Sequence, residues 1–362
     1  MTTVPERAPK ISETEQSPAT RDPVAGGGDS RGGARDADEL QRAVAGLLEL
    51  RAEIGRVVLG QDDVVDELLI GLVSGGHVLL EGAPGLGKTL LVRTVATAAG
   101  MQFARVQFTP DLMPADVTGT MMLLRDDRGG GRLEFQPGPI FTQLLLADEI
   151  NRATPKTQSA LLEAMQEHTV TAAGRSMPLP EPFFVLATQN PIELEGTYVL
   201  PEAQLDRFLV KVLLPYPGEE VLDSILEQTT GAGLAEPRQV LTPAEVLGLQ
   251  RLVREVPVAA HVRRAVARFL LATHPEGEGA DDDVRRFVRF GVSPRGGQSL
   301  LLAAKAHALL SGRYNVAYAD LERVLLPTLR HRFQLNYEGE ANPDVNAEEL
   351  LTRLFARVVA AD

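Results

Sequence analysis

Gly82-Ala83-Pro84-Gly85-Leu86-Gly87-Lys88-Thr89 is the stretch that decides the fold, because it has the spacing G-x-x-x-x-G-K-[ST] of a phosphate-binding loop. A short apolar run at residues 77–80 precedes it and predicts a strand, and residues 89–98 carry helix-compatible apolar side chains. Strand, loop and helix together predict nucleotide binding. A glycine-rich turn that only resembles such a loop is the alternative, and both flanking elements disfavour it.

The loop predicts specific contacts to a nucleotide. Its glycines let successive backbone N–H groups face the phosphates, and the start of the following helix adds partial positive charge. We expect Lys88 to reach the outer phosphates of ATP and the Thr89 hydroxyl to ligate Mg²⁺. The nucleotide contacts expected in this part of the chain are Gly82, Pro84, Gly85, Leu86, Gly87, Lys88, Thr89 and Leu90.

Composition excludes several classes of protein. A chain of 362 residues is suited to two domains, and the absence of cysteine excludes disulfide scaffolds, thiol catalysis and cysteine metal sites. The six histidines show no metal-ligand spacing. No apolar run approaches the roughly twenty residues of a membrane span, and the N-terminal stretch lacks the apolar core of a signal peptide, so we expect a cytoplasmic protein. The net charge of −13 disfavours nucleic acid as the main partner.

The distribution of apolar residues divides the chain into three parts. Residues 1–37 are expected to form a disordered tail, because they contain almost no large apolar side chains. Residues 38–216 are expected to form an α/β domain with a mostly parallel sheet covered by helices, because apolar strands alternate with helices. Residues 217–362 are expected to form a smaller all-α domain, in which the acidic run at residues 281–283 is a solvated loop.

The individual elements follow from the same patterns. In the first domain we expect helices from residue 38 and over residues 62–73, 89–98 and 156–168, and strands over residues 77–80, 103–108, 144–149, 183–189 and 208–214. In the second domain we expect helices over residues 219–228, 243–254, 259–273, 295–310, 319–332 and 347–360.

Two acidic residues end the apolar run at residues 144–149. A buried strand of an open α/β sheet brings the residues at its carboxyl end to the ligand site beside the phosphate loop. We therefore expect Asp148 to hold Mg²⁺ and Glu149 to polarise the water that attacks the γ-phosphate. Two solvent-exposed acids at a strand end are the alternative, which the complete phosphate loop disfavours.

Three further polar residues each have a functional and a structural interpretation. Asn190 ends a strand-like run and would orient the attacking water or sense the γ-phosphate, or it is a turn residue before a proline. Arg207 would enter the nucleotide site of a neighbouring subunit, or it is a surface ion-pair partner of Asp206. Arg295 lies in the first turn of a predicted helix, where a cation opposes the helix dipole, so an anionic partner such as a phosphate is favoured.

The order of these motifs resembles that of AAA+ ATPases, and the segments between them resemble the MoxR family in particular. The resemblance runs from about residue 58 to residue 333, which is nearly the whole folded part of the chain. The segments that carry it are Gly138-Pro139-Ile140-Phe141, Ala147-Asp148-Glu149-Ile150-Asn151-Arg152, residues 156–165, Ala187-Thr188-Gln189-Asn190-Pro191 and Pro201-Glu202-Ala203-Gln204-Leu205-Asp206-Arg207-Phe208.

The resemblance implies a role for each candidate residue. It implies phosphate and magnesium contacts for Lys88 and Thr89, magnesium binding and catalysis for Asp148 and Glu149, sensor 1 for Asn190, an arginine finger for Arg207, sensor 2 for Arg295, and adenine contacts for Val58, Leu59 and Gly60. Gly296-Gly297 departs from the family's alanine-rich helix start and predicts a more flexible attachment of the residue before it.

Two hairpins are expected in the first domain. Residues 108–141 correspond to the family's insert in helix 2, and their apolar segments around Gly129-Gly130-Gly131 independently predict a hairpin. Residues 170–177 correspond to a second hairpin. In rings of this type both hairpins can face the pore or a partner, and simple surface hairpins are the alternative.

The resemblance also implies a function. It implies an ATPase that uses Mg²⁺, assembles into a ring, expected to be a hexamer, and acts as a chaperone-like remodelling or maturation factor. Its clients would often carry a von Willebrand factor A domain. A nucleic-acid motor is one alternative, which the acidic composition disfavours. A scaffold gated by nucleotide binding alone is another, which Glu149 and Arg207 disfavour because a scaffold needs neither.

Overall fold

The computed structural model describes residues 30–125, 131–172, 174–190, 197–231 and 235–361. They belong to two units, residues 1–39 and residues 40–362, and all that follows concerns the second. Most of the expected tail lies outside the described residues. The first helix, α1 (Ser30–Val57), starts at Ser30, so the predicted helix start at residue 38 was too late. Once a helix is nucleated by its amphipathic part, each added turn costs little.

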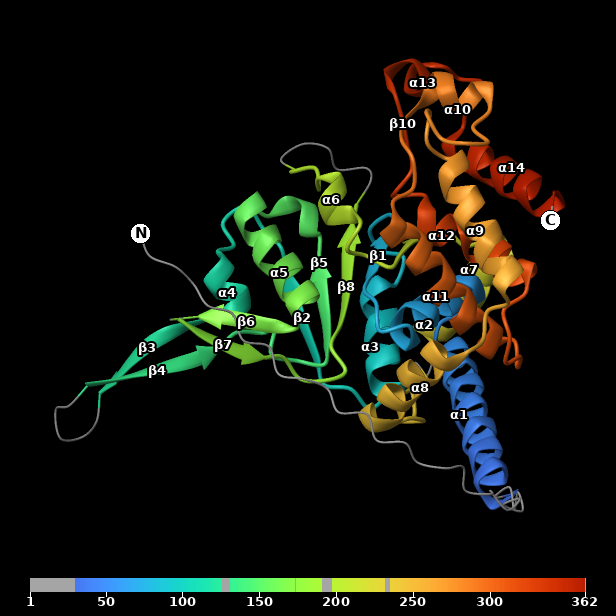
Figure 1. Cartoon of the computed structure of the whole chain (residues 1–362). Helices are drawn as coiled ribbons and strands as arrows, with labels where there is room; N and C mark the ends of the chain where they lie inside the picture. The colour runs from blue at the N-terminus through green and yellow to red at the C-terminus, as the bar shows by residue number, and fades with distance from the viewer. Residues whose placement is uncertain (1–29, 126–130, 173, 191–196, 232–234, 362) are drawn as a thin grey trace, which may run out of the picture. The chain divides into compact units, whose positions relative to one another are not determined.

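A five-stranded parallel sheet organises residues 40–216 (Figure 1). Its strands are β1 (Val78–Glu81), β2 (Phe103–Gln107), β5 (Leu144–Asp148), β8 (Phe184–Gln189) and β9 (Val210–Leu213), in the order β2-β5-β8-β1-β9. The accompanying helices are α2 (Asp62–Val73), α3 (Lys88–Ala98), α4 (Pro114–Thr118), α5 (Pro155–Glu167), α6 (Glu202–Leu205) and the short 3-10 helix η1 (Ile150–Arg152). The predicted α/β fold with a parallel, helix-covered sheet is confirmed.

Successive residues of each strand pack into two different cores. Leu80 and Leu186 point into a core that they share with α2 and α3, whereas Leu79 and Val185 point into a core that they share with α5. Side chains alternate between the two faces of a strand, so a strand covered on both faces must be apolar at nearly every position. This is why the strands of this sheet are recognisable in the sequence as short continuous apolar runs.

Both predicted hairpins are present. Strand β3 (Gly119–Arg125) pairs antiparallel with β4 (Gly131–Pro137), and β6 (Thr169–Ala172) pairs antiparallel with β7 (Arg175–Pro178). Each pair forms a separate two-stranded sheet. The β3–β4 hairpin extends away from the parallel sheet (Figure 1). Its glycine-rich turn lies outside the described residues.

The second domain, called the lid below, is helical with one small addition. Its helices are α7 (Glu219–Thr230), α8 (Pro243–Glu255), α9 (Ala260–Ala272), α10 (Asp282–Phe287), α11 (Pro294–Leu310), α12 (Tyr318–Leu329), α13 (Tyr337–Ala341) and α14 (Ala347–Ala360). The prediction missed the short helices α10 and α13. It also missed a two-stranded antiparallel sheet formed by β10 (Val288–Phe290) and β11 (Gln334–Leu335), so the lid is not purely α-helical.

The acidic run at residues 281–283 is not the solvated loop that was predicted. Asp281 is the N-cap of α10, where its side chain accepts a hydrogen bond from the Val284 N–H at 2.9 Å. The other two acids occupy the first turn, where negative charge is favoured by the helix dipole. A charge run read as solvated was therefore a helix start. Among the described residues, no helix is both long and apolar enough to cross a membrane.

A buried histidine connects the sheet to α5. The backbone N–H of Val185 donates to His77 Nδ1 at 3.1 Å, and His77 Nε2 donates to the Met165 carbonyl at 3.0 Å. Both nitrogens are used in the neutral form, so a second proton would displace the Val185 N–H. Burial lowers the pKa of His77 to about 4 from 6.5.

We expect His77→Gln to remove part of the pH dependence of stability. The unfolded chain takes up a proton on His77 below pH 6.5 and the folded chain only near pH 4, so folding loses stability as the pH falls through that window. In urea unfolding, the stability difference between the parent protein and the variant should shrink by up to about 1.4 kcal/mol per pH unit below 6.5. His261→Gln, at an exposed position, is the control. A difference that stays constant with pH would contradict the assignment.

Candidate active site

The phosphate-binding loop joins β1 to α3 and has the backbone that a phosphate cradle requires. Gly85 and Gly87 have φ angles of 83° and 80°, which side chains with a Cβ rarely adopt. A Cβ built on either glycine meets nothing within 4 Å, so both open onto free space. Gly87 is also the N-cap of α3 and supplies no side-chain cap to the first N–H groups of the helix. These features fit the phosphates of a nucleotide.

Lys88 lies over this loop. Its Nζ donates a hydrogen bond to the carbonyl of Gly82 at 2.6 Å, which keeps the ammonium beside the backbone that would receive phosphate oxygens. Thr89 follows in the first turn of α3 and is half-buried. The two residues therefore lie where the sequence motif requires them for phosphate and Mg²⁺ contacts.

The segment predicted to hold adenine lies against the first helix of the lid. Val58 is buried and Leu59 half-buried at the end of α1. Gly60 has a φ of 65°, and a Cβ there would come within 2.5 Å of Val221 in α7. Val221 was not predicted from the sequence, although an apolar residue one turn after Gly218 was a usable signal. Gly60 thus permits the close approach of α7 to this segment.

Strand register brings the predicted acids to the same edge of the sheet as the loop. Gln107 of β2 pairs with Asp148 of β5, and Leu80 of β1 pairs with Thr188 of β8. Because the strands are parallel, their carboxyl ends meet at one edge. The loop after β1, Asp148 with Glu149, and Asn190 after β8 all lie at this edge. Asn190 is 4% exposed.

The carboxylate of Asp148 is held on both oxygens. Its Oδ1 accepts a hydrogen bond from the Thr188 hydroxyl at 2.6 Å, and its Oδ2 accepts one from the Arg105 guanidinium at 2.7 Å. Thr188 Oγ1 also accepts the backbone N–H of Glu149 at 2.8 Å. Asp148 is only 9% exposed, so these partners offset the cost of burying a charge.

Glu149 has an unusual backbone and a supported side chain. Its φ of 57° lies in the left-handed region, where a residue with a Cβ is held only by surrounding structure. Gln107 Nε2 donates to its Oε2 at 2.7 Å, and Arg152 donates to the same oxygen at 2.9 Å. The carboxylate is therefore fixed in direction before any substrate binds.

Sequence reasoning missed the residues that support the two acids. Thr188 and Gln107 are polar residues near the carboxyl ends of apolar strands, which is the same signal that identified Asn190. Arg105 is a charge inside a strand-like run, and Arg152 follows the acids by three residues. Nothing in the linear order shows that the first three contact residues of a different strand.

Arg207 lies away from this edge. The Leu209 N–H donates to the carbonyl of His77 at 2.8 Å, so the segment that carries Arg207 joins the sheet at the amino ends of β9 and β1. Asp206, the predicted ion-pair partner of Arg207, instead pairs with Arg332 at 2.6 Å. The structural alternative for Arg207 was therefore wrong. In the described part of the chain, Arg207 makes no ion pair.

Arg295 is exposed in the first turn of α11. Ser293 is the N-cap of this helix and accepts the Gly296 N–H at 3.2 Å. Burial lowers the pKa of Arg332, Asp206 raises it, and the nearby charge of Arg295 lowers it further, which places Arg295 close to Arg332. The structure does not bring Arg295 into hydrogen-bond contact with the acids or the loop among the described residues.

The glycines after Arg295 serve close packing and do not loosen the helix start. A Cβ on Gly296 would come within 2.5 Å of Val292, and one on Gly297 within 2.4 Å of Leu270. Both glycines are buried in a continuous helix with a capped start. The predicted flexible attachment of Arg295 was therefore wrong.

The donor set suits Mg²⁺ better than a transition metal. The described residues contain no group of three or more histidine, cysteine, aspartate or glutamate side chains that could hold a metal by themselves. Mg²⁺ favours one or two protein oxygens completed by phosphates and water. Thr89 and Asp148, on neighbouring parts of one edge, are the protein oxygens available for it.

Comparison with known proteins agrees with this geometry. Residues 77–210 match the model of the ATPase family associated with various cellular activities (AAA), and residues 280–354 match the AAA lid domain. The chain is 42% identical to Chaperone MoxR1 of Mycobacterium tuberculosis, over 94% of this chain and 87% of that protein. It is 34% identical to Protein MoxR of Paracoccus denitrificans, over 86% of this chain and 95% of that protein. A crystal structure from Cytophaga hutchinsonii superimposes with a TM-score of 0.84 at 36% identity, covering 90% of this chain and 98% of that one.

We expect Thr188→Val to lower ATP turnover about 10- to 100-fold while ATP affinity stays close to that of the parent protein, because the hydroxyl orients both acids and is not predicted to touch the nucleotide. The matched control is Thr157→Val, which removes a buried hydroxyl that donates to the Leu112 carbonyl at 2.7 Å. Steady-state ATPase rates and nucleotide titrations check both variants. Equal losses of turnover in the two variants would show that only stability was affected.

Proposed function

The chain belongs to the MoxR family of AAA ATPases, and we propose that it works as a ring of identical subunits whose ATP hydrolysis remodels partner proteins. ATP binding and hydrolysis belong to the family. The ring, which we infer to be a hexamer, and the chaperone activity are the parts proposed. The printed name of the mycobacterial relative, Chaperone MoxR1, supports the chaperone activity.

The position of Arg207 is the observation that carries the ring. Its segment joins β9 at the amino end, whereas the phosphate loop follows the carboxyl end of β1, which is parallel to β9. The four residues of β1 span about 13 Å of strand, at roughly 3.3 Å per residue. Arg207 therefore faces away from the loop of its own subunit, and we assign it to the nucleotide site of a neighbour.

The remaining residues of the reaction come from one subunit. Backbone N–H groups of the loop and the start of α3 bind the phosphates, and Lys88 neutralises their outer oxygens. Asn190 lies at the same edge and orients the attacking water. Glu149 accepts the proton of that water, and its contacts with Gln107 and Arg152 hold its carboxylate in direction.

Thr89 and Asp148 would hold Mg²⁺. When bound, this ion neutralises charge on the β- and γ-phosphates as the bond to the leaving group breaks. Thr188 and Arg105 hold the Asp148 carboxylate in one orientation, so little reorganisation is needed at the site.

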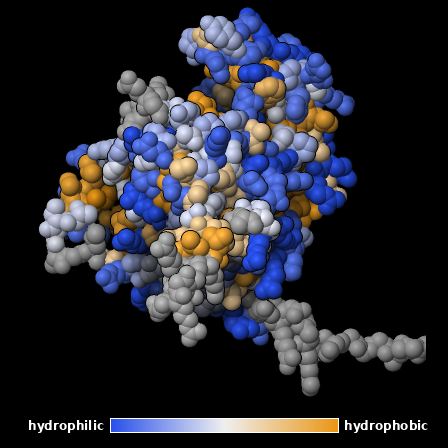
Figure 2. Space-filling view, turned by 90° about the vertical axis from the view of Figure 1, so that its left-hand side faces the viewer, coloured by the Kyte–Doolittle hydropathy of each residue, from blue (hydrophilic) through white to orange (hydrophobic). Residues whose placement is uncertain are grey.

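The β3–β4 hairpin supports a surface for client proteins. Met122, Leu123 and Leu133 expose 47%, 59% and 64% of their surfaces. Figure 2 views the side of the molecule where this hairpin lies, and apolar areas interrupt the hydrophilic surface there. Exposed apolar side chains are typical of protein-binding surfaces. We infer that partner proteins, including those with von Willebrand factor A domains, contact this hairpin.

We expect Arg207→Ala to bind ATP but to lose turnover by about 10³-fold or more, because a trans arginine finger contributes about that much. Mixing it with Lys88→Ala should restore part of the activity, since an intact loop from one subunit then meets an intact Arg207 from the other. Steady-state ATPase rates over a series of mixing ratios measure this, with mixed rings verified by mass.

The control for mixing is Glu149→Gln with Lys88→Ala. Both substitutions damage the same half of the site, so no mixed ring contains an intact site and no recovery is expected. Recovery in this control, or none with Arg207→Ala in verified mixed rings, would contradict the proposed ring mechanism.

We expect the triple variant Met122→Ser, Leu123→Ser and Leu133→Ser to keep basal ATPase activity and to lose suppression of the aggregation of heat-denatured citrate synthase. Light scattering measures the second activity. Leu226→Ser with Leu271→Ser is the matched control, because these residues are 53% and 51% exposed on the lid. Equal chaperone activity in both variants would exclude the hairpin as the client surface.

A further inference from the structure

A buried arginine of the lid holds the segment that carries Arg207. Arg332 is 8% exposed, and its Nε donates to Asp206 Oδ1 at 2.6 Å. The other guanidinium N–H groups donate to backbone carbonyls of Asp206 (3.1 Å), Phe208 (2.6 Å), Leu209 (3.0 Å) and Thr328 (2.5 Å). All five N–H groups of the side chain are used, and four of the five bonds end on residues that flank Arg207.

Asp206 connects the same segment to the start of α11. One carboxylate oxygen accepts from Arg332, and the other accepts from the Ser293 hydroxyl at 3.4 Å. Ser293 is the N-cap of α11, two residues before Arg295. A Cβ on Gly296 would lie 3.1 Å from Arg332 Cδ, so the first turn of α11 also packs on the arginine. One carboxylate thus links the positions of Arg207 and Arg295.

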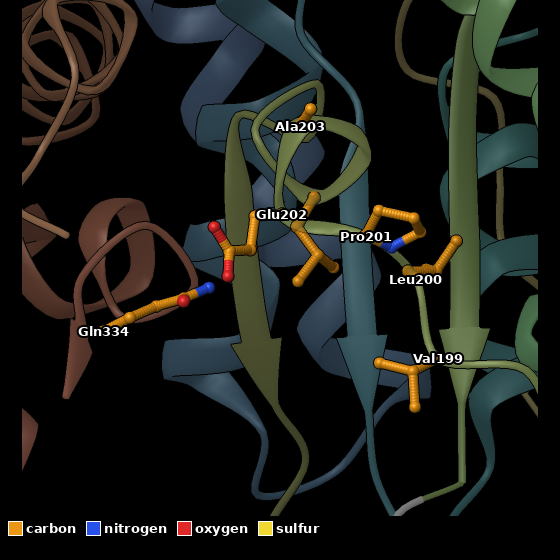
Figure 3. Close-up of a pocket in the computed structure, with 7 residues that line it drawn as sticks. Val199, Leu200, Pro201, Glu202, Ala203 and Gln334 are labelled. Carbon is orange, nitrogen blue, oxygen red and sulfur yellow. The ribbon is translucent and has the colours of Figure 1, made fainter. Parts of the chain in front are cut away.

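The lid meets this part of the first domain at a second place. A pocket of about 510 Å³ is lined by residues 199–203, Leu205 and Gln334. Figure 3 shows that Glu202, from α6, and Gln334, from β11, point toward each other across it. His331 adds a further bond from the lid, because its Nε2 donates to the Phe208 carbonyl at 3.1 Å. The Arg207 segment is therefore attached to the lid on both sides.

We propose that Asp206 and Arg332 are positioning residues that fix the Arg207 segment to the lid, so that the arginine offered to the neighbouring nucleotide site moves together with α11. The proposal rests on the proposed role of Arg207 in a ring. Burying the Arg332 charge is costly without Asp206, and the fork of its guanidinium matches carbonyls that a lysine could not bind together. Neither residue touches the nucleotide in this assignment.

The test is Asp206→Asn, which keeps an acceptor for Arg332 and removes the charge. We expect turnover at saturating ATP to fall about 10- to 100-fold, as for a displaced catalytic group, while ATP affinity remains unchanged. Mixing with Lys88→Ala should restore activity, because the defect lies in the residue offered to the neighbour. Asp320→Asn is the matched control: it removes a lid carboxylate that pairs with Arg313 and His307 and does not contact the Arg207 segment.

A milder pair keeps the test decisive if Asp206→Asn does not fold. Ser293→Ala and Asn346→Ala each remove the N-cap of a lid helix, and only Ser293 contacts Asp206. We expect a loss of turnover, restored by mixing, for Ser293→Ala alone. Turnover of Asp206→Asn equal to that of Asp320→Asn, or a loss that mixing does not restore, would overturn the positioning role.

Arg207→Ala, measured in parallel, separates this inference from the proposed function. If Arg207→Ala is inactive and is rescued by Lys88→Ala while Asp206→Asn and Ser293→Ala retain full turnover, the ring mechanism stands and the positioning role fails. If Arg207→Ala itself retains turnover, the ring mechanism fails and the positioning role fails with it.

Discussion

Parallel pairing between β5, β8 and β1 is the constraint on which the site depends. The register places Asp148, Thr188 and the start of the phosphate loop at one level of one sheet edge. A shift by one residue would turn the strand ends over and send the acids to the opposite face. The apolar residues of both cores specify this register, because each strand is buried on two sides. The position of the catalytic groups is thus set by packing of residues that take no part in the chemistry.

Buried charges in this protein are placed only where their hydrogen-bonding groups have partners. Asp148 is bound by Thr188 and Arg105, and Arg332 uses every N–H group of its guanidinium. A buried charge without such partners costs several kcal/mol, so each of these groups requires its neighbours to stay in place. In the first case the result is an oriented acid, and in the second it is a segment attached to the lid. The same electrostatic requirement therefore acts at both ends of the sheet.

Glycine plays two different roles in the same regions. Gly85 and Gly87 adopt left-handed backbone and leave open space in front of the loop, which suits a ligand. Gly296 and Gly297 have ordinary helical backbone and are filled around by Val292 and Leu270, which suits close packing. Both pairs look alike in the sequence. The difference lies in what surrounds them, and this is why the second pair was wrongly predicted to make the helix start flexible.

Much of the fold was predictable because its signals are local. The continuous apolar runs predicted all five strands of the sheet, and the helix predictions for the lid agree closely with α7, α8, α9, α11, α12 and α14. The short elements α10, α13, β10 and β11 were missed, because three to six residues carry little periodicity and are held by their neighbours. The run at residues 281–283 shows the same limit: charge alone does not distinguish a solvated loop from the start of a helix.

The sequence by itself determined the phosphate loop, the acids at a strand end and the family, since each depends on residue types at fixed spacing along the chain. Only the tertiary structure decided which residues support them. Thr188 and Arg105 reach Asp148 from other strands, and Arg332 reaches Asp206 from 126 residues away. Partners so distant in sequence are chosen by the folding of the chain around a shared core, because a charge can be buried only where the whole fold brings its hydrogen-bond partners to it.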